Sequence, residues 1–264
     1  MAMVLLECEK LTVGFGGLIA VKEVDFSVGA GEVVGLIGPN GSGKSTLFNL
    51  ITGIYLPTKG NTLFKGVPIT GKSPAEISRM GIARTFQSSR LFLELSVLDN
   101  VLSGMWYRER SGVLEALFLR KRLNRRMGGC IDRAVSLLRY FSQDLGSDPD
   151  KRAGDLTLGD RRRLEICRAL ATDPDLLLLD EPSAGMDPEE TRTLMADIEK
   201  ARQRKPEIGI VIIEHDLGVV QTIAHRVAVL NYGEKIAEGP FEKIAEDPNV
   251  RSAYLGGETP HAQA

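Results

Sequence analysis

A glycine-rich loop that follows directly on a short apolar run constrains the fold of this chain more than any other feature. The run, Val33–Ile37, is continuously apolar, as a strand covered on both faces of a sheet is. The loop fits the pattern G-x-x-x-x-G-K-S/T in full and opens a helix-like segment at residues 44–52. It consists of Gly38, Pro39, Asn40, Gly41, Ser42, Gly43, Lys44, Ser45 and Thr46. A strand, such a loop and a helix in this order predict a phosphate-binding loop.

The residue types of this loop suit the phosphates of a nucleotide. Glycines 38, 41 and 43 let the backbone turn tightly and direct its amides inward, so that these amides and the helix N-terminus bind phosphate. We expect the Lys44 ammonium at the β- and γ-phosphates and the Ser45 hydroxyl on Mg²⁺. A glycine-rich turn that binds no ligand is the alternative interpretation.

Continuous apolar runs and alternating segments predict two kinds of sheet. Residues 33–37, 176–179 and 208–213 are apolar throughout, which is typical of strands buried on both faces of a parallel sheet. Residues 5–13 and 21–28 have apolar residues at or near every second position, which predicts half-buried strands of an antiparallel sheet. Because helix-like segments separate the apolar runs, we expect an α/β fold.

Composition changes along the chain predict its domain organisation. Pro188–Arg204 has a helical pattern, with Asp187 as its expected N-cap. Residues 88–154 have no strand-like runs and are rich in arginine and leucine, so we expect an inserted helical lobe there. The chain has 264 residues, enough for one two-lobed domain. We therefore expect a single domain at 1–255, with its core at 1–87 and 155–240, and a disordered tail at 256–264.

Charge, hydropathy and cysteine content argue against several classes of protein. The formal net charge is −2, so the chain has no overall basic field and we expect no nucleic-acid partner. No apolar run approaches the roughly 20 residues that span a bilayer. The first ten residues lack a signal-peptide pattern, so we expect a cytoplasmic protein. Cys8, Cys130 and Cys167 lack metal-site or disulfide spacing, and we expect them to be buried or half-buried.

Acidic and imidazole side chains follow two of the expected buried strands, at the points where these strands end. Asp180 would meet Mg²⁺, directly or through water, and Glu181 would polarise the attacking water as a general base. His215 follows residues 208–213 at the same edge of the sheet, where ligands of parallel sheets collect, and could contact the γ-phosphate. The alternatives are a strand that simply reaches a polar loop and a structural histidine.

These motifs, in this order, give the chain a resemblance to the ATP-binding subunits of ABC transporters over residues 5–255. The resemblance implies a P-loop NTPase core with a mixed sheet, an N-terminal antiparallel β subdomain and an inserted helical subdomain. It also implies that the protein binds ATP and Mg²⁺ and hydrolyses ATP. Gln87 is similar to the family's glutamine that contacts the metal and senses the membrane partner. Phe15 is similar to the aromatic residue that stacks on adenine, with a core or surface aromatic as the alternative.

Residues 156–161, Leu-Thr-Leu-Gly-Asp-Arg, stand where the family has its signature, Leu-Ser-Gly-Gly-Gln. Thr157 keeps a hydroxyl group, and Gly159 keeps a glycine at a helix N-terminus, where phosphate can bind. Leu158 and Asp160 replace a glycine and a glutamine. The resemblance assigns Thr157, Gly159 and Asp160 to a nucleotide site. We interpret the arginines at 161–163 as a solvated face; the alternative is that they serve the helix that follows the signature.

Partners also follow from the resemblance. In this family the signature of one subunit completes the ATP site of a second, which implies a homo- or heterodimer. Residues 183–187 are similar to the D-loop through which the two sites communicate. The resemblance further implies a place on the inner face of the cell membrane, with permease subunits as direct partners and a solute-binding protein as an indirect one. Residues 91–107 are the candidate permease surface; a helical bundle that only packs on the core is the alternative.

Three segments narrow the resemblance within the family. They are residues 84–87, 158–166 and 247–256, and all are similar to segments of the ATP-binding subunits of branched-chain amino acid importers. A cassette for urea uptake or for lipopolysaccharide export is one alternative. A soluble ABC ATPase acting on ribosomes or DNA is another, although such proteins usually carry two cassettes or a long coiled-coil insertion.

Overall fold

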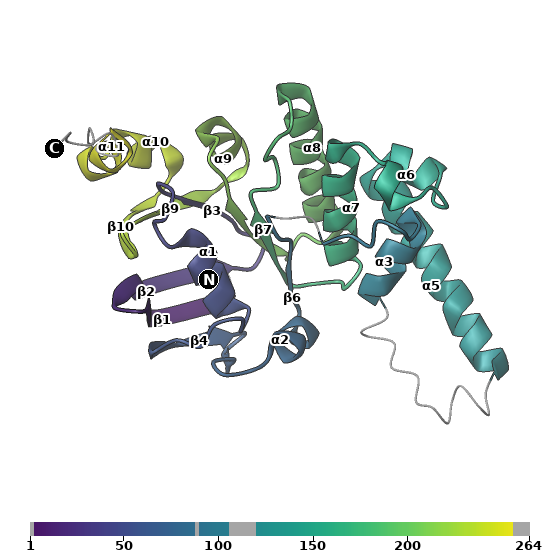
Figure 1. The fold of residues 1–264 in the computed structure, drawn as a ribbon, viewed down its shortest axis with the longest axis horizontal. Helices are drawn as coiled ribbons and strands as arrows, with labels where there is room; N and C mark the ends of the chain where they lie inside the picture. Colours follow the sequence, from purple (N-terminus) through teal and green to yellow (C-terminus); the bar gives the residue numbers. More distant parts are fainter. Residues whose placement is uncertain (1–2, 88–89, 106–119, 256–264) are drawn as a thin grey trace.

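The computed structural model describes residues 3–87, 90–105 and 120–255. A small antiparallel sheet, a larger sheet and helices around them make up the architecture (Figure 1). Residues 88–89 and 106–119 of the expected helical lobe, and the whole expected tail at 256–264, lie outside the described residues.

The chain opens with an antiparallel sheet whose strands lie in the order β2-β1-β4-β5. β1 pairs with β2 on one side and with β4 on the other. Leu6, Leu11 and Val21 are fully buried and belong to an apolar cluster that also includes Val34 and Leu36. The strands are β1 (Val4–Phe15), β2 (Leu18–Gly29), β4 (Lys59–Phe64) and β5 (Val67–Pro68). The predicted antiparallel opening is confirmed.

The larger sheet has the strand order β10-β9-β3-β8-β7-β6 and is parallel except at β10. Every residue of β3, β7 and β8 is buried, which explains the continuous apolar runs. The strands are β3 (Val33–Ile37), β6 (Ile82–Arg84), β7 (Leu176–Asp180), β8 (Gly209–Ile213), β9 (Arg226–Asn231) and β10 (Glu234–Gly239). Because β3, β8 and β7 are neighbours, their carboxyl ends bring the phosphate loop, His215 and Glu181 to one edge.

Helices flank the larger sheet and form a lobe beside it (Figure 1). α8 begins after the predicted N-cap Asp187, whose side chain accepts from the amides of Glu189 and Glu190 in a capping box. Between β6 and β7 lie α3 (Val97–Met105), α5 (Arg120–Phe141), α6 (Gln143–Ser147), a 3₁₀ turn (Ala153–Asp155) and α7 (Leu158–Leu170). The other helices are α1 (Lys44–Ile51), α2 (Pro74–Met80), α8 (Pro188–Arg204), α9 (Leu217–Ile223), α10 (Phe241–Glu246) and α11 (Pro248–Leu255).

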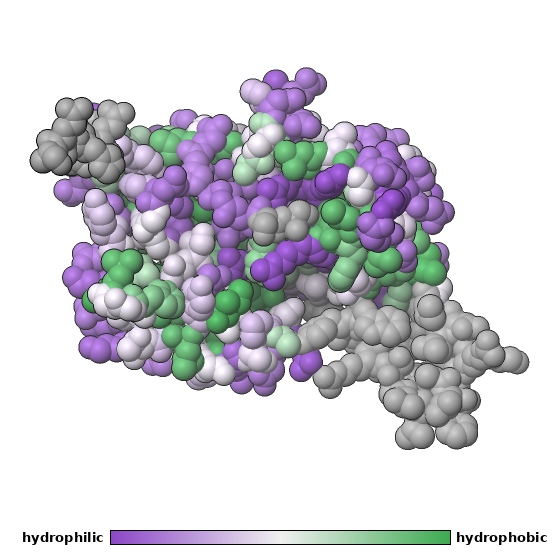
Figure 2. Space-filling model, in the orientation of Figure 1, coloured by the Kyte–Doolittle hydropathy of each residue, from purple (hydrophilic) through white to green (hydrophobic). Residues whose placement is uncertain are grey.

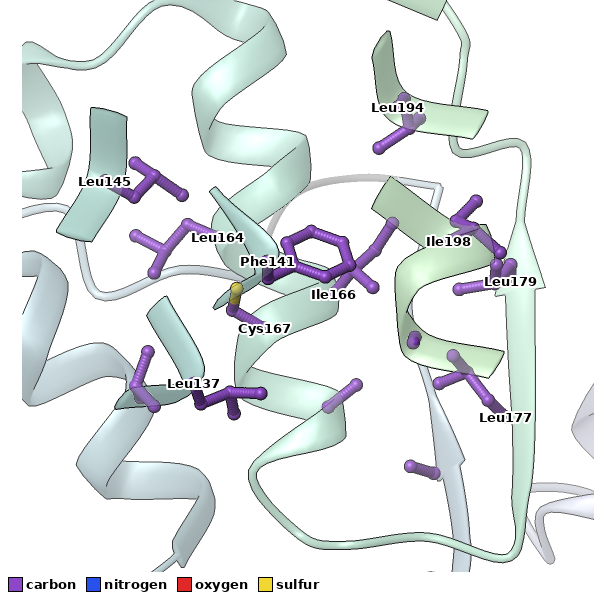
Figure 3. Packing of buried hydrophobic residues seen from close by; sticks show 14 of the residues in the cluster. Leu137, Phe141, Leu145, Leu164, Ile166, Cys167, Leu177, Leu179, Leu194 and Ile198 are labelled. Atoms are coloured by element: carbon purple, nitrogen blue, oxygen red, sulfur yellow. The ribbon is translucent and has the colours of Figure 1, made fainter. Parts of the chain in front are cut away.

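One apolar cluster joins the helical lobe to the larger sheet. Figure 3 shows Phe141 of α5 beside Cys167 of α7, with Leu179 of β7 and Ile198 of α8 in the same cluster. All four side chains are fully buried. Full burial of a side chain such as Phe or Leu stabilises a fold by about 1.5–3 kcal/mol. The cluster therefore fixes the lobe against the sheet that carries the candidate site.

The three cysteines are free, and they lie as the sequence predicts. Cys8 and Cys167 are buried, and Cys130 is half-buried. Burial raises the pKa of the Cys8 thiol to about 12, so this group stays protonated and unreactive near neutral pH.

The surface carries both polar and apolar side chains. On the face shown in Figure 2, apolar residues form small patches among polar ones. None of the described helices has the length and apolar character needed to cross a membrane.

Candidate functional site

The phosphate loop joins β3 to α1, and its backbone requires glycine. Gly38, Gly41 and Gly43 have φ angles of 147°, 78° and 104°, a region that residues with a Cβ rarely adopt. An added Cβ at Gly38 would lie 2.0 Å from the carbonyl oxygen of Leu230 in β9, and one at Gly43 would lie 2.5 Å from that of Ala20. Substitution at either position must therefore displace backbone.

The turn between β9 and β10 braces this loop. The Gly233 amide donates to the Ser42 carbonyl oxygen across 3.0 Å, and the Gly233 carbonyl oxygen accepts from the Lys22 amide of β2 at 2.8 Å. Hydrogen bonds therefore connect the antiparallel sheet, the β9–β10 turn and the phosphate loop.

Lys44 lies inside the loop and is 5% exposed. Its Nζ donates to the carbonyl oxygens of Gly38 at 2.8 Å and Pro39 at 2.9 Å. Burial lowers the pKa of Lys44, and the negative charges of Glu181 and Asp180 oppose this shift. Among the described residues, the hydrogen-bond partners of the ammonium are thus neutral, and it can exchange them for phosphate oxygens.

Asp180 ends β7 as a buried carboxylate, 3% exposed. Its Oδ2 accepts from Arg84 Nη2 at 2.8 Å, whereas its buried Oδ1 has no hydrogen-bond partner in the described part of the chain. The next residue, Glu181, has a φ angle of 50°, which a residue other than glycine adopts only where its surroundings impose it. Backbone strain and an unpartnered buried oxygen both favour a functional role for this strand end.

Gln87 and His215 hold the Glu181 carboxylate. Gln87 Nε2 donates to Glu181 Oε2 at 2.8 Å, and His215 Nε2 lies 2.8 Å from Glu181 Oε1. The structure thus brings together three residues that were predicted separately from distant parts of the sequence. The contacts of Gln87 with a metal ion and of His215 with the γ-phosphate stay predictions.

Glu214, to which the sequence assigned no role, is buried behind this group. Its Oε1 accepts from the amide of Ser183 at 2.9 Å and from the Ser183 hydroxyl at 2.7 Å. Burial raises the pKa of Glu214 in spite of these hydrogen bonds. The contact ties the segment expected to be the D-loop to the end of β8. The signal in the sequence was an acidic residue directly before His215.

Phe15 stands at the end of β1 and is 46% exposed. Its ring meets that of Tyr55 edge to face, with the ring centroids 5.0 Å apart. An exposed aromatic face at the edge of a sheet suits stacking on a base, and this role of Phe15 stays a prediction. Tyr55, which follows α1, carried no recognisable signal in the sequence.

The signature residues form the first turn of α7. Thr157 is the N-cap, and its Oγ1 accepts from the Asp160 amide at 3.1 Å. The Asp160 carboxylate accepts from the Thr157 hydroxyl at 3.1 Å and from Arg163 Nη1 at 3.4 Å. Gly159 is buried, and an added Cβ there would lie 2.9 Å from Oε1 of Glu190. The Asp160 carboxylate therefore has partners within this chain, and the nucleotide contacts of these residues stay predictions.

The expectation that the arginines at 161–163 form a solvated face is wrong. All three are half-buried and donate to groups elsewhere in the chain. The bonds run from Arg161 Nη2 to the Gly154 carbonyl oxygen (2.5 Å), from Arg162 Nη2 to the Gln87 carbonyl oxygen (2.9 Å) and from Arg163 Nε to Asp197 Oδ2 (2.7 Å). The acceptors of Arg162 and Arg163 are distant in sequence, so a local run of charge could not indicate them.

Comparisons with known proteins agree with this geometry. The family model described as ABC transporter matches residues 21–184, and that described as branched-chain amino acid ATP-binding cassette transporter matches residues 234–259. The chain is 40% identical over 256 residues to the high-affinity branched-chain amino acid transport ATP-binding protein LivG of Escherichia coli, covering 97% of this chain and 99% of that protein. It is 35% identical to a probable LivG of Methanocaldococcus jannaschii, covering 96% and 98% of the two chains.

Solved structures show the same likeness. A nucleotide-free ATP-binding cassette from an ABC transporter superposes with a TM-score of 0.82 at 34% identity, covering 96% of this chain and 99% of that one. The ADP conformation of such a cassette gives a TM-score of 0.81 at 34% identity, with the same coverage. The family match spans the phosphate loop, the glutamine, the signature and the strand end that carries Asp180 and Glu181. The chain therefore belongs to the ABC transporter family, as one of its ATP-binding and ATP-hydrolysing cassettes.

Proposed function

We propose that this chain hydrolyses ATP with Glu181 as the general base, and that hydrolysis drives import of branched-chain amino acids through a membrane permease. The observation that carries the catalytic part is the position of Glu181 at the end of β7, bonded to Gln87 and His215 on its two carboxylate oxygens. A carboxylate held in this way suits a base that accepts the proton of the attacking water. His215 would then also reach the γ-phosphate.

The nucleotide would lie across the loop and the end of the antiparallel sheet. We assign its phosphates to the backbone amides of the loop at residues 38–46 and to the Lys44 ammonium, which donates to the neutral carbonyl oxygens of Gly38 and Pro39. Phe15 would stack on the adenine ring. The whole site lies in one domain, for which we propose the limits 1–255, with 88–154 as an insertion in the core.

The end of β7 fits a magnesium ion. Asp180 Oδ1 is buried without a hydrogen-bond partner in the described residues, and Mg²⁺ in nucleotide sites binds one or two carboxylates together with phosphate oxygens and water. Ser45 at the start of α1, Asp180 and Gln87 would supply such oxygens, since Gln87 uses its amide nitrogen toward Glu181. When bound, the ion supplies positive charge that offsets the charge of the phosphates.

A second cassette, either this chain or a related one, would complete the site. Thr157, Gly159 and Asp160 at the N-terminus of α7 would face the nucleotide that the second subunit holds. The permease would contact the helical lobe, of which residues 91–105 are described, and would place the cassette on the cytoplasmic face of the membrane. The hydrogen bond from Arg162 to the carbonyl oxygen of Gln87 links α7, which would face the second subunit, to the segment that leads into the helical lobe. This link supports the proposed arrangement. A solute-binding protein would deliver the cargo to the permease.

The cargo follows from the relatives. LivG of Escherichia coli and its counterparts are branched-chain amino acid transport proteins, and the match at residues 234–259 is to a family model with the same description. Copurification with the permease subunits, followed by uptake measurements in vesicles, tests the assignment. Uptake of leucine, isoleucine or valine is the expected result. A complex that transports urea instead would change the cargo and leave the ATPase in place.

Glu181→Gln tests the catalytic part. Because the amide keeps the size of the carboxylate but accepts no proton, the variant should bind ATP, accumulate as a closed dimer and lose about 100-fold or more in hydrolysis rate. Phosphate release and size-exclusion chromatography with ATP measure the two effects. Hydrolysis at the wild-type rate would show that Glu181 is not the base.

A further inference from the structure

Arg84 is a buried cation beside the carboxylate that ends β7. Its Nη2 donates to Asp180 Oδ2 across 2.8 Å, and the two side chains are only 7% and 3% exposed. A buried ion pair loses much hydration, and it persists only with good geometry and further hydrogen bonds. The position of Arg84 is therefore a specific feature of this site and not a surface contact.

Side chains from four other positions fix the guanidinium. Nη1 donates to Asn49 Oδ1 at 2.6 Å and to Thr52 Oγ1 at 3.3 Å, both at the end of α1, the helix that the phosphate loop opens. The guanidinium carbon also lies 5.3 Å from the ring centroid of Phe48 and 5.0 Å from that of Phe86, and such stacking favours arginine over lysine. Arg84 thus has one orientation set by α1 and by the segment that leads to Gln87.

The Asp180 carboxylate has two oxygens in different situations. Oδ2 accepts from Arg84, whereas Oδ1 is buried and has no hydrogen-bond partner in the described part of the chain. A buried charged oxygen without a partner is unfavourable unless a further group binds it. The negative charge of Asp180 also opposes the lowering of the Lys44 pKa that burial causes.

We propose that Arg84 is a positioning residue for the metal–nucleotide site: it holds Oδ2 of Asp180 so that Oδ1 is left for Mg²⁺ or a water bound to it. This inference rests on the proposed role of Asp180 at the metal. Groups that hydrogen-bond a metal ligand fix its orientation, and their loss weakens metal binding about 10- to 100-fold. A merely structural ion pair would stabilise the fold with no separate effect on the metal.

Arg84→Gln separates these two roles, with Arg90→Gln as the matched control. Arg90 stacks on the same Phe86 ring, with its guanidinium carbon 4.1 Å from the ring centroid, but only Arg84 pairs with Asp180 among the described residues. Mn²⁺ is titrated into a slight excess of protein over a non-hydrolysable ATP analogue, and bound Mn²⁺ is followed by EPR. Analogue affinity is measured separately in EDTA.

We expect Arg84→Gln to weaken Mn²⁺ binding by about tenfold or more, while analogue affinity in EDTA stays within about twofold of the wild type, since the loop amides and Lys44 are intact. Arg90→Gln should match the wild type in both measurements. Arg84→Lys keeps the charge but cannot reach Asp180, Asn49 and Thr52 together, so its Mn²⁺ affinity should lie between those of the wild type and Arg84→Gln. If Arg84→Gln does not fold, Arg84→Lys is used for the test instead.

Equal Mn²⁺ affinity in wild type and folded Arg84 variants would overturn the inference. So would loss of analogue binding in EDTA, because Arg84 would then support the loop and not the metal. If the wild-type complex bound Mn²⁺ no more tightly than the free analogue does, the metal role proposed for Asp180 would fail, and the inference with it.

Discussion

Lys44→Ala tests the phosphate loop most directly. In the structure the Lys44 ammonium is nearly buried and donates to the carbonyl oxygens of Gly38 and Pro39 at 2.8 and 2.9 Å. When ATP binds, these neutral acceptors are replaced by charged phosphate oxygens, so binding gains the difference between neutral and charge-assisted hydrogen bonds. That gain is lost in the variant.

The size of the loss follows from the charge of the partner. Hydrogen bonds to charged groups contribute about 1.5–3 kcal/mol each, against about 1 kcal/mol for neutral ones. With two bonds exchanged at a gain of about 0.5–2 kcal/mol each, we expect a loss of about 1–4 kcal/mol, or about 5- to 700-fold in Kd. The thermal midpoint should move by only a few degrees. The variant loses the hydrogen bonds of the ammonium, but it also no longer buries this charged group away from water.

Isothermal titration calorimetry with ATP in the presence of Mg²⁺ measures this loss. Lys22→Ala is the control, because Lys22 is a half-exposed lysine paired with Glu234 on the surface, and its Kd should match the wild type. A folded Lys44→Ala variant with unchanged ATP affinity would refute the assignment of the loop.

Three further changes test the fold around the site. Phe141→Ala empties a fully buried position between the lobe and the sheet and should cost about 3–5 kcal/mol in the free energy of unfolding, measured with urea. Gly38→Ala should abolish ATP binding or folding, since its Cβ would collide with the Leu230 carbonyl oxygen; binding within threefold of the wild type would contradict this. Although burial raises the pKa of Glu32, bonds from Arg226 and the Gly29 amide hold it below its usual value. This stabilisation is present above the unfolded-state pKa and is lost as pH falls through the folded-state pKa, so Glu32→Gln should lose less stability than the wild type on acid titration.

Local patterns predicted much of the fold and part of the site. The phosphate loop and the buried strands β3, β7 and β8 could be identified because each depends on contiguous residues: a motif, or an apolar run covered on both faces. The capping box at Asp187 is equally local, since all its hydrogen bonds lie within the first turn of α8.

Contacts between distant residues were the part that sequence could not supply. Glu181 was predicted as a base, but its simultaneous bonds to Gln87 and His215 depend on how β6, β7 and β8 lie in the sheet. Arg163 looked like one member of a solvated charge run, yet its acceptor, Asp197, is on α8. A charged residue in a sequence does not reveal whether a buried carboxylate or carbonyl oxygen lies near its side chain, because packing between distant elements decides this.

The bonds of Gly233 to both Lys22 and Ser42 give the site a fixed length. If adenine lies on Phe15 of the antiparallel sheet and the phosphates lie in the loop, the two ends of the nucleotide are bound by parts that this turn joins. The spacing between Phe15 and the loop then selects ligands by length, because a ligand with the base and phosphates of ATP occupies both places at once. A free pyrophosphate or a free adenosine occupies only one end, so neither can draw on the binding energy of the other.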